Sequence, residues 1–113
     1  MIFSTRVGGV DTQFGAREMN LREAIKDLAE LPREATIYVA EGTTLTGAVP
    51  VLLVGRGAKA PPGWRYFLEV LIAREVLEVW SSWHNDRMPS PEEADEAIIY
   101  YAENDAYIYD DLA

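Results

Sequence analysis

The residues best suited to a binding surface lie near the C-terminal end of the 113-residue chain, where tyrosines alternate with acidic side chains. Exposed tyrosine beside carboxylates is typical of a protein interface that captures a basic partner. An alternative is that Tyr107 and Tyr109 cover the second face of a sheet. We expect the partner-binding residues to be Glu92, Glu96, Tyr100, Glu103, Asp105, Tyr107, Tyr109, Asp110 and Asp111.

The charge of the chain is unevenly distributed. The formal net charge is −9, and residues 86–113 carry nine acidic side chains against one basic side chain, Arg87. Such a field repels phosphates of nucleic acids and anionic lipid surfaces, and it speeds encounter with basic proteins. The sequence therefore predicts no direct nucleic-acid or membrane binding. An alternative is that the acidic residues only keep a small protein soluble.

Catalytic groups are scarce. His84 is the only histidine, and Ser81, Ser82 and Asp86 are close to it in sequence. Residues two apart on a helix do not face each other, and a catalytic triad needs side chains that converge from separate elements. We interpret His84 as a favourable partner of a helix C-terminus and expect no enzymatic activity. A small enzyme that uses carboxylates remains an alternative.

The sequence predicts neither a metal nor a cofactor. The chain has no cysteine, and its only metal candidates are the carboxylates of Glu92, Glu96 and Glu103, which fall on one side of a helix. No calcium-binding loop with oxygen ligands at alternating positions is present. Residues 55–60 superficially fit a dinucleotide motif, but Pro61 and Pro62 follow instead of the helix that such a loop must open into.

Three amphipathic helices are expected to position these side chains. Asn20 and Glu23 form a capping box before a helix that ends at Pro32. A second helix covers residues 72–85, with Trp80 in its apolar stripe and therefore in the core. Ser90, Pro91 and Glu93 predict the start of a third helix, which ends at Asn104 or Asp105.

The predicted strands span residues 36–40, 48–54, 66–71 and 106–109, where β-branched, aromatic or continuously apolar residues are concentrated. In the third of these strands, alternation puts Tyr66 and Leu68 on one face and Phe67 on the other. The order is helix, three strands, two helices, strand. This order predicts an α+β fold with a mainly antiparallel sheet of three to five strands packed with three helices.

The length and composition favour one globular domain. Apolar residues make up 49% of the chain and charged residues 26%, close to the average for globular proteins. We expect residues 20–113 to form this domain, and residues 1–19 to be an N-terminal extension, mostly loop, with room for a short strand over residues 2–7. No signal peptide or membrane span is visible, so a cytoplasmic location is expected.

Two segments resemble a known family. LREAIKDLAELPREATIYVA and, further along, EAIIYYAENDAYI resemble a family of small uncharacterised bacterial domains. Its members carry a leading helix, a Leu-Pro stop, an Ile-Tyr-Val strand and a C-terminal signature around Glu103–Ile108. The resemblance covers roughly residues 20–109 and brings no catalytic residue with it. In size, acidity and type of fold, the chain also resembles the immunity proteins encoded beside bacterial toxins.

We therefore expect a non-enzymatic inhibitor that binds a basic protein, most concretely an immunity protein for a nuclease-type toxin. Toxins that act on nucleic acids carry cationic clefts, so an acidic inhibitor gains both steering and complementarity. A phage-encoded inhibitor of a nucleic-acid-binding bacterial defence complex would show the same features. A housekeeping domain without inhibitory function is the remaining alternative.

Overall fold

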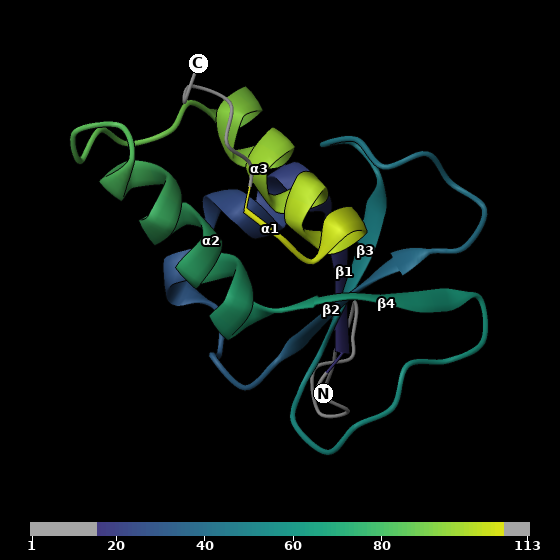
Figure 1. Cartoon of the computed structure of the whole chain (residues 1–113). Helices are drawn as coiled ribbons and strands as arrows, with labels where there is room; N and C mark the ends of the chain where they lie inside the picture. The colour runs from purple at the N-terminus through teal and green to yellow at the C-terminus, as the bar shows by residue number, and fades with distance from the viewer. Residues whose placement is uncertain (1–15, 108–113) are drawn as a thin grey trace.

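A computed structural model describes residues 16–107 and shows an α+β fold, as the sequence predicts. Four strands form one sheet, and the helices lie together on one side of the molecule (Figure 1). The elements are β1 (Ala16–Asn20), α1 (Leu21–Lys26), the 3-10 helix η2 (Leu28–Glu30), β2 (Thr36–Ala40), β3 (Pro50–Val54), β4 (Trp64–Glu69), α2 (Val70–Ser82) and α3 (Pro91–Asn104).

The sheet has the order β1-β3-β2-β4, and all its pairs are antiparallel. The sequence does not predict strand β1, whose residues Ala16–Asn20 pair along the whole length of β3; the predicted loop over the rest of residues 1–19 lies outside the described residues. β1 is an edge strand with exposed Arg17 and Glu18, and polar residues are common on edges, so it lacks an apolar period. The strand considered for residues 2–7 lies outside the described residues.

Helix α1 begins at the predicted capping box. The Asn20 side chain accepts a hydrogen bond from the Glu23 amide at 2.8 Å, and the Glu23 carboxylate accepts one from the Asn20 amide at 2.9 Å. The helix ends at Lys26, earlier than predicted, and the chain tightens into η2. Arg74 of α2 donates to the carbonyls of Leu28, Ala29 and Leu31, which ties this turn to α2.

Strand β4 contains a bulge that the sequence does not reveal. Ile37 pairs with Leu68, whereas the next residue of β2, Tyr38, pairs with Tyr66, so Phe67 has no opposite residue. A bulge places an extra residue in one strand and interrupts the alternation of faces. Phe67 and Leu68 are consequently both buried, and the predicted placement of Tyr66 and Leu68 on one face is wrong.

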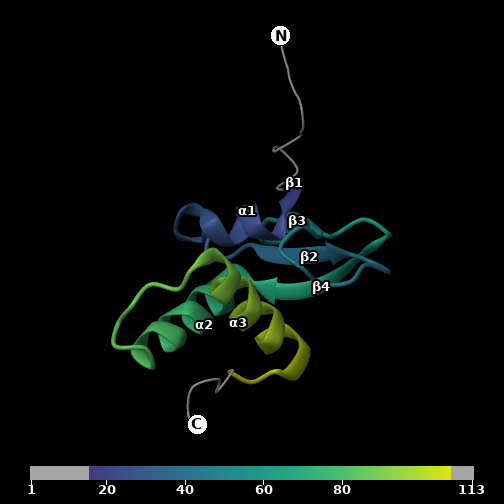
Figure 2. The same ribbon diagram turned by 90° about the horizontal axis from the view of Figure 1, so that it is seen from above.

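The core lies between the helices and one face of the sheet. Its largest fully buried side chains come from α1, the two central strands, α2 and α3: Leu21, Ile37, Val39, Val51, Val70 and Ile98. Trp80 is 3% exposed, which confirms its predicted place in the core. Helices α2 and α3 lie side by side (Figure 2), so the outer surface of α3 is free to face solvent.

Candidate functional site

The outer surface of α3 carries a stripe of acidic residues around one tyrosine. Glu92, Glu96, Tyr100 and Glu103 follow one another at spacings of four, four and three, so they share one side of the helix. All four are exposed, and we call them the acidic face. Asp105 is also exposed and ends the helix in the left-handed conformation, with its amide donating to the Tyr101 carbonyl at 2.7 Å.

Two other acids of α3 are held by arginines. Arg87 donates two hydrogen bonds to Glu93, at 3.0 and 3.1 Å, and Glu93 also completes the capping box with Ser90. The Arg87 guanidinium, together with the Ser90 amide, lowers the pKa of Glu93 to about 2. This ion pair fixes the loop between α2 and α3 to the start of α3.

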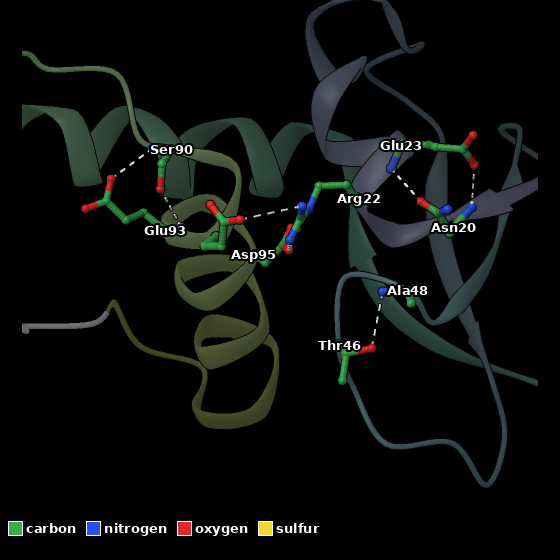
Figure 3. Close-up of polar contacts among 9 residues, drawn as sticks. Asn20, Arg22, Glu23, Thr46, Ala48, Ser90, Glu93 and Asp95 are labelled. Carbon is green, nitrogen blue, oxygen red and sulfur yellow. Dashed lines mark hydrogen bonds and ion pairs between the residues drawn. The ribbon is translucent and has the colours of Figure 1, made fainter.

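The second of these acids, Asp95, joins α3 to α1. The Nε and Nη2 of Arg22 donate to one carboxylate oxygen of Asp95 at 2.8 and 2.6 Å (Figure 3). The hydrogen bonds from Arg22 to Asp95 raise the pKa of the guanidinium above its ordinary value, which keeps Arg22 charged. Asp95 is 7% exposed, and its second oxygen, Oδ1, is buried without a hydrogen-bond partner in the structure.

A glycine makes room for this ion pair. The Gly47 carbonyl accepts a hydrogen bond from the Arg22 amide at 2.7 Å, and a Cβ at position 47 would overlap the Asp95 carboxylate. The loop between β2 and β3 therefore packs directly on the link between α1 and α3. The sequence does not reveal this link, because Arg22 and Asp95 are 73 positions apart. The available signal was the position of Asp95, next to the apolar residues Ala94 and Ile98.

An open groove of about 600 Å³ lies between α1, α2 and the loop that leads into α3. We call it the α1–α2 groove. Apolar side chains make most of its surface, and Met88, 80% exposed, stands on its rim. Its lining residues are Arg22, Ile25, Lys26, Leu77, Glu78, Ser81, Asp86, Met88, Pro89, Ser90, Pro91 and Ala94.

The loop that carries Met88 is tied down at several points. Asn85 and Asp86 are both left-handed, with φ of 59° and 61°, and the Asp86 amide donates to the Ser81 carbonyl at 2.8 Å. The Arg87 guanidinium also lies 4.8 Å from the centre of the Trp80 ring, within the range of a cation–π contact. The exposure of Met88 therefore belongs to a constrained loop.

His84 lies at the C-terminal end of α2, as the sequence predicts. Its ring stacks on Trp80, with centroids 3.7 Å apart and planes 7° from parallel. Its Nδ1 is 2.6 Å from the Trp80 carbonyl oxygen, which also accepts a hydrogen bond from the Trp83 amide at 3.1 Å. The stacking on Trp80 and the short distance to its carbonyl give His84 a packing role. The nearby Ser82 hydroxyl donates to the Val79 carbonyl and not to His84.

Tyr107 lies apart from the acidic face. Its ring packs against Trp83 and Tyr101, with centroids 6.0 and 5.2 Å away, and burial raises the pKa of its hydroxyl. Ala106 and Tyr107 are not in a strand, which corrects the prediction of a strand at this point. The rest of that strand, and the predicted binding residues Tyr109, Asp110 and Asp111, lie outside the described residues.

The structure thus brings four of the nine predicted binding residues together, places Asp105 at the end of the same helix, and puts Tyr107 against the core. Among residues 16–107, no three histidine or acidic side chains lie close enough to share a metal ion. In the same part of the chain, no helix is long and apolar enough to cross a membrane.

Comparisons with known proteins identify no relative of this chain. No model of a known protein family, no curated protein and no solved structure matches the chain. The resemblance to the family with the signature around Glu103–Ile108 therefore stays a prediction, and the candidate site stands on the geometry described above.

Proposed function

We propose that this chain is a non-enzymatic inhibitor that captures a basic protein, most concretely an immunity protein that neutralises a nuclease-type toxin. The observation that supports the proposal is the acidic face. Glu92, Glu96 and Glu103 are exposed on the same side of α3 as Tyr100, while Glu93 and Asp95 are held by hydrogen bonds from Arg87 and Arg22.

The arrangement suits both steps of such a capture. Exposed carboxylates on one side of a helix create a local negative field, which raises the association rate with a cationic cleft. Tyr100 then offers an aromatic anchor in the middle of that field, and tyrosine is enriched among residues that dominate binding energy. The acids steer the basic protein, and the tyrosine slows its dissociation.

The test compares two charge variants of equal net charge. The first is Glu96→Gln with Glu103→Gln, on the acidic face. The matched control is Glu41→Gln with Glu69→Gln, at exposed positions outside α3. The chain is used to isolate its binding protein from the native host, and association rates are measured at low and physiological ionic strength.

We expect the acidic-face variant to associate about 3–10 times more slowly at low salt than the control, and its salt dependence to be flatter. Addition of the unmodified chain should also inhibit the nuclease activity of the captured protein. Equal rates for the two variants, or a captured protein that is acidic and binds independently of salt, would contradict the proposal.

A further inference from the structure

The α1–α2 groove offers an apolar surface that the acidic face does not use. Ile25 and Ala94 form part of its buried floor, Leu77 is partly buried, and Met88 stands on the rim. Methionine is flexible and polarizable, and it is common on surfaces that accept apolar side chains of other proteins. A groove lined in this way fits a row of apolar side chains.

The charges around the groove favour a basic occupant. Arg22 is already compensated by Asp95, and its Nη1 is also 3.9 Å from Glu92. The other charged residues of the lining are one lysine, Lys26, and two acids, Glu78 and Asp86, so the rim carries a net negative charge. Glu92 is a member of the acidic face and reaches Arg22 on the groove wall, which makes the two surfaces continuous.

We infer that the α1–α2 groove seats a basic amphipathic helix of the captured protein. Apolar side chains at spacings i, i+3, i+4 and i+7 fill the groove, and lysine or arginine side chains beside them meet Glu78, Asp86 and Glu92. This inference rests on the proposed function, because it assigns the apolar anchor of the same basic partner.

Other features near the groove do not compete for this role. At the start of α3 the amides of Ser90 and Glu93 are taken up by the capping box, and Pro91 has no amide hydrogen, so little of this helix start is left for an anion. The constrained loop keeps Met88 exposed, so the rim needs little ordering when a helix binds.

The probe is a synthetic peptide of about 18 residues, with leucine at the helical spacing and lysine elsewhere. One control peptide has the same composition without an apolar face, and another has glutamate in place of lysine. Binding is followed by the methyl NMR signals of Ile25, Leu77 and Met88 and by fluorescence anisotropy. We expect the lysine peptide to shift these methyl signals and to bind more weakly as salt rises.

The decisive variant is Met88→Ser, because Met88 is 80% exposed and its replacement leaves the core unchanged. The matched control is Leu71→Ser, an exposed apolar residue of α2 that does not line the groove. We expect Met88→Ser to weaken binding of the lysine peptide about tenfold and Leu71→Ser to leave it unchanged. A Glu78→Gln variant should lower the affinity and reduce its salt dependence.

Several results would overturn the inference. These are methyl shifts outside the groove, equal binding of the lysine and glutamate peptides, or equal binding of the peptide without an apolar face. A dimer of this chain that Met88→Ser dissociates would assign the groove to a second copy instead. If the groove variants have no effect while the Glu96 and Glu103 variants still slow capture, the groove inference fails and the proposed function stands.

Discussion

The link between Arg22 and Asp95 predicts that its two ends contribute unequally to stability. Asp95→Ala removes the two hydrogen bonds that Arg22 donates. A hydrogen bond to a charged group contributes about 1.5–3 kcal/mol. It also removes the buried Oδ1 that lacks a partner, which recovers part of that loss. We therefore expect Asp95→Ala to lower the free energy of unfolding by about 2–3 kcal/mol, or roughly 4 °C in Tm for each kcal/mol.

The opposite variant, Arg22→Met, leaves the buried Asp95 carboxylate without its partner. A buried charge that loses its partner costs about 3–5 kcal/mol. After Asp95→Ala, in contrast, the remaining guanidinium is still close to solvent, since the Arg22 side chain is 44% exposed. The loss should therefore be larger for Arg22→Met than for Asp95→Ala.

Urea unfolding of both single variants and of the double variant measures this asymmetry as a double-mutant cycle. The double variant should be more stable than the sum of the two single losses implies. A larger loss for Asp95→Ala, or strictly additive losses, would refute the reasoning from the buried carboxylate.

The remaining predictions concern the core, the α2–α3 loop and the acidic face. Trp80→Ala should cost about 3–5 kcal/mol in urea unfolding, because this ring is 3% exposed; an unchanged midpoint would place it outside the core. Arg87 lowers the pKa of Glu93 from 4.5 to about 2, so the pair contributes stability above about pH 4.5 that is lost as the pH falls toward 2. Glu93→Gln should therefore flatten the dependence of Tm on pH in that range, and an unaltered profile would argue against the pair. Tyr100→Ala should speed dissociation of the captured protein by a factor equivalent to about 2 kcal/mol, whereas Tyr66→Ala, exposed but on the sheet, should not.

Local signals predicted the helices well. The capping boxes at Asn20 and Ser90 depend only on residues three apart, so the sequence alone locates the starts of α1 and α3. The stripe through Trp80 predicts the buried side of α2 for the same reason. The acidic face also followed from helical spacing, once the start of α3 was placed.

Features that depend on distant segments were not predicted. Strand β1 exists because it pairs with β3, and its own residues carry little strand signal. The bulge at Phe67 depends on the register with β2. The role of Asp95 depends on Arg22, which lies 73 positions earlier in the sequence and is brought beside it only by the fold. The position of Tyr107 also depends on a residue of another helix, since its ring packs against Trp83.

The same distance in sequence has a consequence for the nascent chain. At about 5–20 residues per second, the ribosome takes roughly 4–15 s to add the 73 positions between Arg22 and Asp95. During that interval α1 lacks its partner helix, and the residues of α3 that close one end of the α1–α2 groove have not yet been made. The groove is therefore completed only after Pro91 and Ala94 have been added, so its apolar surface is not a finished binding site before the start of α3 is made.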